Sequence, residues 1–233
     1  MAFNSVSLMP AKKITPKVAQ AKKVATKTTK KSTVKKKTDV TVQPEILVVD
    51  NASKKQKSNG PIKTMLARER VITEDTDLAR ELFNQSAFGT VLEDGKVQLS
   101  LTEALYLMEK KKIVVLDGKN KSLDFPSFVS KASRAEPKFW IRYAVYKDMR
   151  NRGYVVKTAL KFGADFRVYD RGIKPGQDHA RWIVYPVHEG EKYTWFDFAA
   201  KNRVAHSTKK RLMMGVVDDE NDVTFWEIKW VRP

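Results

Sequence analysis

Residues 137–160 read PKFWIRYAVYKDMRNRGYVVKTAL, a segment in which helical spacing gives way to a strand-like run. Large apolar residues recur there every third or fourth position: Phe139, Tyr143, Tyr146 and Met149. This period places them on one face of a helix that spans 137–152. Gly153 then ends the helix, since glycine readily takes the left-handed conformation that closes one. The β-branched and aromatic residues at 154–160 predict a strand directly after it.

Downstream of this segment, apolar runs alternate with turns and predict further strands at 166–170, 181–187, 211–217 and 223–231, with a helix at 195–209. Residues 136–233 are therefore predicted to form one α+β domain. The order of the strands in its sheet does not follow from the pattern.

Upstream, residues 63–135 predict a smaller α/β domain. Its expected elements begin with a helix at 77–86 that stops at Gly89, followed by a hairpin in which Val91 and Leu92 pair with Val97 and Leu99 across Asp94-Gly95. A second helix is expected to start at the capping box Ser100-Leu-Thr-Glu103, with Leu101, Leu105 and Met108 on one apolar face. A strand at 112–116 and a helix at 122–134 complete the prediction. Pro137 disfavours helix in the residue before it, so the boundary between the domains is expected at 135–136.

The first 62 residues have a different composition. Residues 1–60 contain 14 lysines against 3 acidic residues, and no aromatic residue follows Phe3. Too few large apolar side chains are present to offset the entropy lost on ordering, so this tail is predicted to be disordered. It is either a non-specific arm that binds phosphates through counterion release or a solubilising extension.

Composition limits the classes of function. A net charge of +18 favours a polyanionic partner, while the absence of cysteine excludes disulfides and thiolate chemistry. Only three histidines, at 179, 188 and 206, leave little for a metal site, so neither a metal nor a cofactor is expected. The longest apolar runs are too short to cross a membrane, and the start lacks a signal-peptide pattern; a soluble, cytoplasmic protein is expected.

No phosphate-binding loop, zinc-peptidase motif or nucleophile elbow occurs in the chain. The remaining Tyr, His and Lys side chains in a basic domain are sufficient to cleave RNA without a metal. The attacking 2′-hydroxyl must lose a proton, the leaving 5′-oxygen must gain one, and the extra negative charge on phosphorus must be balanced.

Several stretches resemble the archaeal tRNA-splicing endonuclease family: YAVYKDMRNRGYVVK at 143–157, KFGADFRVY at 161–169, AHSTKK at 205–210, VVDDENDVT at 216–224 and, less closely, LSLTEALYLME at 99–109. The similarity covers residues 70–233 and excludes the tail. It implies a small α/β N-terminal domain followed by a nuclease-like catalytic C-terminal domain. It also implies metal-independent cleavage that leaves a 2′,3′-cyclic phosphate and a 5′-hydroxyl.

The resemblance assigns three catalytic residues. Tyr169 corresponds to the general base, His179 to the general acid, and Lys210 to the cation that stabilises the charged phosphorane. A phenol with a pKa near 10 is only about 0.1% ionised at neutral pH, so a base of this type needs a cation nearby. Taken without the resemblance, the same residues are a core aromatic at a strand end, a loop histidine and a solvated lysine.

Two further residues match positions that bind substrate in the family. Arg203 corresponds to an arginine that stacks on an extruded bulge base, and Trp230 lies where other members place a second stacking side chain. Stacking suits this role because every base has a π face. The alternatives are a surface arginine and an edge-strand tryptophan. His188 is expected in a turn and His206 in helix packing.

The acidic run Asp218, Asp219, Glu220 and Asp222 would repel phosphate, so it is not expected to bind RNA. In the family a similar loop docks into a basic groove of another subunit; otherwise these residues form a solvated turn. The sequence as a whole predicts a subunit that cuts precursor tRNA at bulge-helix-bulge junctions, in a homotetramer or with a related subunit. The alternative is a non-catalytic RNA-binding protein that keeps the fold.

Overall fold

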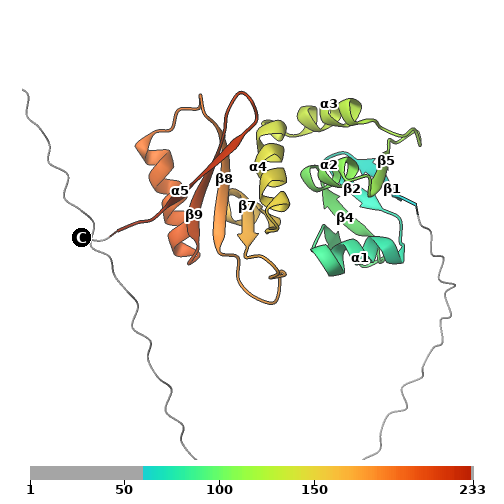
Figure 1. Cartoon of the computed structure of the whole chain (residues 1–233), viewed down its shortest axis with the longest axis horizontal. Helices are drawn as coiled ribbons and strands as arrows, with labels where there is room; N and C mark the ends of the chain where they lie inside the picture. Colours follow the sequence, from blue (N-terminus) through green and yellow to red (C-terminus); the bar gives the residue numbers. More distant parts are fainter. Residues whose placement is uncertain (1–59, 232–233) are drawn as a thin grey trace, which may run out of the picture. The chain divides into compact units, whose positions relative to one another are not determined.

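The computed structural model describes residues 60–231, which contain two five-stranded sheets (Figure 1). The lysine-rich tail predicted from the sequence lies almost wholly outside the described residues. The mixed α+β class is confirmed. Ile62, which the sequence assigned to the end of the tail, is already the first residue of a strand.

The first sheet has the strand order β3-β4-β2-β1-β5 and comprises β1 (Ile62–Ala67), β2 (Arg70–Thr73), β3 (Thr90–Val91), β4 (Val97–Ser100) and β5 (Ile113–Leu116). β1 and β2 were not predicted from the sequence. They join through Arg68, whose φ of 52° is left-handed although no glycine or asparagine marks the turn. β1 then pairs in parallel with β5, so the first and last strands of this sheet in chain order lie side by side.

The predicted hairpin is confirmed in part. Val91 pairs with Val97 as expected, but Leu99 pairs with Val71 of β2, because β4 lies between β3 and β2. Leu92 is held by a backbone hydrogen bond from its N–H to Lys96 O, outside the strand.

Helix α1 (Asp77–Ser86) matches its predicted range, yet it closes earlier than expected. Ala87, not Gly89, is the left-handed cap, with φ of 54°. Gly89 has another role: a Cβ at this residue would lie 2.6 Å from Gln98 O, so only glycine allows β4 to approach so closely.

Helices α2 (Leu101–Glu109) and α3 (Phe125–Ala135) complete this domain. The capping box of α2 is confirmed, with Ser100 Oγ accepting from Glu103 N and Glu103 Oε2 accepting from Ser100 N. α3 begins at Phe125, three residues later than predicted, because the Asp124 carboxylate accepts from Ser127 N and caps it there.

The second sheet has the order β10-β9-β8-β7-β6, in which only β8 and β9 are parallel. Its strands are β6 (Val155–Ala159), β7 (Ala164–Tyr169), β8 (Trp182–His188), β9 (Arg211–Val217) and β10 (Val223–Ile228), with the short 3₁₀ helix η1 (Leu160–Phe162) between β6 and β7. β10 ends before its predicted limit of 231.

Helices α4 (Phe139–Asn151) and α5 (Trp195–Ser207) cover opposite faces of this sheet (Figure 1). Trp182 and Val184 of β8 join the core beneath α4, whereas Ile183 and Tyr185 pack with Ala205 of α5. A strand covered on both faces is apolar throughout, as β8 is from 182 to 187.

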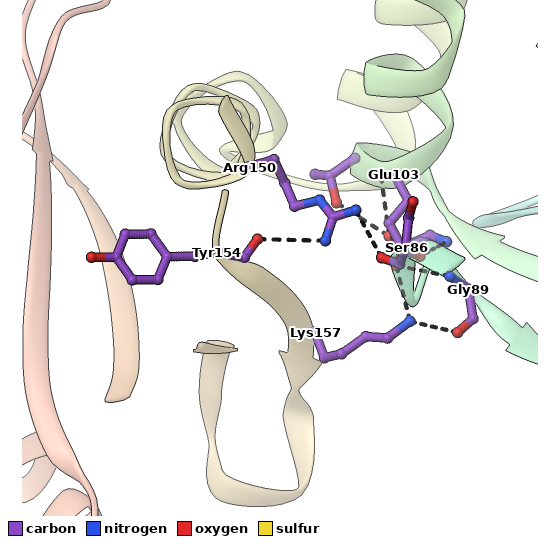
Figure 2. Close-up of polar contacts among 8 residues, drawn as sticks. Ser86, Gly89, Glu103, Arg150, Tyr154 and Lys157 are labelled. Carbon is purple, nitrogen blue, oxygen red and sulfur yellow. Dashed lines mark hydrogen bonds and ion pairs between the residues drawn. The ribbon is translucent and has the colours of Figure 1, made fainter. Parts of the chain in front are cut away.

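A buried carboxylate links the smaller domain to β6 (Figure 2). Glu103 is only 5% exposed, and its Oε1 accepts from Gly89 N at 3.0 Å and from Lys157 Nζ at 3.3 Å. Lys157 Nζ also donates to Gly89 O. Arg150 adds a second link by donating to Ser86 O at 2.9 Å. Burial lowers the pKa of Lys157, while the charge of Glu103 acts in the opposite direction.

The Glu103 contacts generate a stability prediction. Glu103→Ala removes the capping carboxylate and leaves the Lys157 ammonium buried without its counter-charge, so the free energy of unfolding should fall by about 3–5 kcal/mol. Urea unfolding followed by circular dichroism measures this loss. Glu109→Ala is the control, because its partner Lys147 is more exposed and the loss should stay below about 1 kcal/mol. Equal losses in the two variants would contradict the structural role of Glu103.

Candidate active site

Three chain segments meet at one end of the inner strands of the second sheet. Val168, Trp182 and Arg211 lie side by side on β7, β8 and β9. Arg181 N donates to Val168 O at 2.9 Å, and Arg211 N donates to Arg181 O at 3.0 Å. Because β7 runs against β8 and β8 runs with β9, the end of β7 meets the starts of the other two strands here.

Tyr169, His179 and Lys210 all lie just beyond this row, and together they line one cavity of about 400 Å³. Tyr169 is the last residue of β7 and is 4% exposed, packed with Val155 and Ala180. The three residues that the resemblance assigned to catalysis are thus brought together, although they are far apart in sequence.

The loop from 170 to 181 carries His179. It is closed by hydrogen bonds from Ile173 N to Asp170 O and from Lys174 N to Gln177 Oε1. Gly176 has φ of 97°, which a residue with a Cβ takes only with strain. At the end of the loop, His179 N donates to Asp178 Oδ1 at 2.6 Å, and the His179 side chain is exposed in the cavity wall.

Lys210 is positioned by the C-terminal turn of α5. Lys210 N donates to Ala205 O at 2.9 Å, and Lys209 before it takes a left-handed φ of 54°. The Lys210 Nζ donates to Thr208 O at 3.0 Å and lies 5.4 Å from the centroid of the Phe162 ring. The ammonium keeps two of its three N–H donors for other acceptors in the cavity.

The same cavity contains an arginine that the sequence analysis missed. Arg167 precedes Tyr169 by two positions on β7, and its guanidinium carbon lies 5.9 Å from the centroid of the Tyr169 ring. Alternation along a strand places residues i and i+2 on the same face, so the spacing FRVY contained the signal. A phenol, an imidazole, an ammonium and a guanidinium therefore share one site, a set suited to proton transfer beside an anion.

Arg203 and Trp230 border a separate groove of about 660 Å³. Trp230 follows β10, so it is not an edge-strand residue, and 53% of its surface is exposed. Its ring lies edge-on to His206 of α5, with centroids 4.7 Å apart; His206 is exposed and lines the same groove, whereas the sequence predicted a role in helix packing. The two side chains expected to stack on bases are thus found in one groove.

The acidic run forms the turn between β9 and β10. Asp218 Oδ1 accepts from Asp222 N at 2.8 Å and closes the turn. Asp219 Oδ1 lies 3.0 Å from Nε2 of His188, the last residue of β8, and Trp140 Nε1 donates to Asn221. Asp219 and Glu220 are exposed, so their carboxylates face outward from a turn that is anchored on its own domain.

Residues 60–231 contain neither a group of metal ligands nor a helix that could span a membrane. Among these residues no three His, Cys, Asp or Glu side chains are grouped so that they could hold a metal ion. None of the helices described has the length and hydropathy that crossing a bilayer requires.

Comparison with known protein families gives two adjoining matches. Residues 62–129 match the N-terminal domain of tRNA intron endonuclease, and residues 139–225 match its catalytic C-terminal domain. The chain belongs to the tRNA intron endonuclease family. This confirms the resemblance read from the sequence motifs, and the second match contains Tyr169, His179 and Lys210.

Individual relatives of this family show how much of the chain is shared. A protein named tRNA-splicing endonuclease from Thermococcus onnurineus is 44% identical over 172 residues, which are 74% of this chain and 98% of that protein. Its namesake from Methanothermobacter thermautotrophicus is 39% identical over 174 residues, 74% of this chain and 99% of that protein. The namesake from Nanoarchaeum equitans is 44% identical over 149 residues, 61% and 94% of the two chains.

Proposed function

We propose that this chain is an endonuclease that removes introns from precursor tRNA. The observation that carries the proposal is the convergence of Tyr169, His179 and Lys210 in one cavity, within a chain of the tRNA intron endonuclease family. The cut falls at bulge-helix-bulge junctions and leaves a 2′,3′-cyclic phosphate and a 5′-hydroxyl. No metal ion takes part.

The proposed chemistry divides two proton transfers between two side chains. Tyr169, as phenolate, takes the proton of the 2′-hydroxyl, and the 2′-oxygen forms a bond to the adjacent phosphorus. The bond from phosphorus to the 5′-oxygen breaks, and the His179 imidazolium gives its proton to that oxygen. Lys210 stabilises the additional negative charge on the phosphorane. The net result is an internal transesterification, so no water is consumed in the cut.

Recognition of the bulge is proposed for the groove at α5. A base turned out of the helix would stack on the Trp230 ring and on the planar Arg203 guanidinium, which border the same groove. The residues that hold the base are thus separate from those that move protons, as positioning and chemistry require different side chains.

An assembly of several chains is also proposed. One chain carries one Tyr-His-Lys set, whereas an intron has two junctions, so two active chains must act on one substrate. The exposed carboxylates of Asp219 and Glu220 would dock on a basic surface of another copy, and a closed homotetramer satisfies both requirements. A hetero-oligomer with a related subunit is the other arrangement.

The first test is cleavage of a bulge-helix-bulge RNA in EDTA. The wild type should cut, whereas His179→Ala and Lys210→Ala should each lower the single-turnover rate by about 10²–10⁴-fold, the usual contribution of an acid, base or charge stabiliser. RNA affinity should change little. Lys192→Ala, which removes one exposed lysine next to α5, should keep the wild-type rate. Tight binding of the RNA by a wild-type protein that never cuts would favour the non-catalytic alternative.

The second test concerns the groove. Arg203→Ala and Trp230→Ala should each weaken binding of the bulged RNA by about 5- to 150-fold, equivalent to about 1–3 kcal/mol per stacked base. A fully base-paired RNA of the same length should bind all variants alike. Trp226→Ala is the control, since this tryptophan is 61% exposed on β10 and borders no cavity with Arg203. Equal losses for the paired and bulged RNAs would exclude stacking on the bulge.

The third test concerns assembly, and Asp218 is left intact because it closes its own turn. Asp219→Lys combined with Glu220→Lys replaces attraction for a basic surface by repulsion, so the mass measured by light scattering should fall. The control, Glu81→Lys with Glu93→Lys, makes the same charge change at two exposed positions elsewhere. A wild-type monomer, or a double variant that keeps the full mass, would refute docking by this turn.

A further inference from the structure

Arg167 occupies a wall shared by two cavities. It lines the cavity of Tyr169, His179 and Lys210, and it also lines a neighbouring cavity of about 250 Å³ that includes Lys157 and Lys174. On β7 it lies on the same face as Tyr169, and the guanidinium carbon is 5.9 Å from the ring centroid. The side chain therefore lies beside the proposed reacting groups.

The guanidinium of Arg167 lacks an anionic partner within the part of the chain described, residues 60–231. Its Nε is buried and has no hydrogen-bond acceptor. Three other arginines of the same domain have carboxylate partners: Arg181 pairs with Asp170, Arg152 with Asp148, and Arg211 with Glu227. The Nη groups of Arg167 likewise form no hydrogen bond within residues 60–231, so the charge of the guanidinium is left for an acceptor that these residues do not supply.

The cross-strand neighbour of Arg167 is also a cation, which increases the positive charge around its guanidinium. Lys157 on β6 lies directly opposite Arg167 on β7, and like charges at such positions destabilise a sheet. The only carboxylate paired with Lys157 among the described residues is Glu103, which also accepts from Gly89 N (Figure 2). Glu103 accepts from Ser100 N as well. Glu103 thus neutralises Lys157 alone, and Arg167 opposite it keeps its charge for an external anion.

We infer that Arg167 is a fourth substrate-contacting residue of this site, and that its guanidinium binds the non-bridging oxygens of the RNA phosphate that is cut. A guanidinium presents N–H donors in a planar fork that matches two phosphate oxygens, which an ammonium such as Lys210 does not. Arg167 thus fixes the orientation of the phosphate, while Lys210 faces it as a point charge. The inference rests on the proposed function for the identity of that phosphate.

A double cycle of binding measurements tests this contact without requiring cleavage. The RNAs carry a 2′-deoxy sugar at the cut nucleotide, so they cannot be cut, and either a normal phosphate or an uncharged methylphosphonate at the scissile linkage. Each is titrated against wild type, Arg167→Gln and Arg167→Lys. In the wild type, neutralising the phosphate should weaken binding by about 10-fold, as expected for one charge-assisted bidentate contact. In Arg167→Gln the loss should be clearly smaller, about 2- to 3-fold, because only the point charge of Lys210 then faces the phosphate.

The same binding measurements on a paired arginine provide the control. Arg152→Gln removes the same charge from an arginine that is paired with Asp148 and borders neither cavity, so it should keep the wild-type response to the methylphosphonate. Arg167→Lys should show an intermediate response and guards against a folding defect in the glutamine variant. An equal loss on neutralisation in wild type and both Arg167 variants overturns the inference. A wild type that shows the coupling but never cuts normal RNA would contradict the proposed function and leave the phosphate contact established.

Discussion

Two backbone hydrogen bonds, from Arg181 N to Val168 O and from Arg211 N to Arg181 O, fix the place where the candidate site forms. They hold β7, β8 and β9 in one row, and Tyr169, the His179 loop and Lys210 each leave the sheet next to it. Because the sheet sets the register, the side chains need no direct bond to one another to stay close. A proton donor and a proton acceptor can then lie on either side of a phosphate.

The buried Glu103 extends this constraint into the smaller domain. Its carboxylate caps α2, accepts a hydrogen bond from Gly89 N and pairs with Lys157 on β6. Only glycine fits at position 89, because a Cβ there would collide with Gln98 O of β4. Lys157 in turn lies opposite Arg167, which lines the candidate site. The N-terminal domain therefore contributes to the electrostatics of the catalytic domain through one ion pair. Loss of the Glu103–Lys157 ion pair would affect both the stability of the fold and the positive charge beside the candidate site.

The sequence predicted most of the C-terminal domain because its elements have clear periodicity and end at strong signals. The helix before Gly153 and the strand 211–217 are examples, as is the capping box at Ser100. It failed at β1 and β2, where the turn uses a left-handed Arg68 and gives no local signal, and it could not order the strands. Motif similarity supplied Tyr169, His179 and Lys210, whose convergence depends on long-range pairing. Arg167 was missed: its spacing from Tyr169 indicates only a shared face of the strand, whereas the lack of a carboxylate partner is seen only in the folded structure.

The central claim is that the site at these strand ends promotes attack of an RNA 2′-oxygen on the adjacent phosphorus. Its most direct test is the chemical nature of the new ends. A bulge-helix-bulge RNA is incubated with the protein in EDTA, and the fragments are analysed by mass spectrometry. The account predicts a 5′ fragment ending in a cyclic phosphate, lighter by one water than the linear phosphate, and no product when the cut nucleotide carries a 2′-deoxy sugar. Cleavage of the deoxy substrate, or a 5′-phosphate on the downstream fragment, would contradict it.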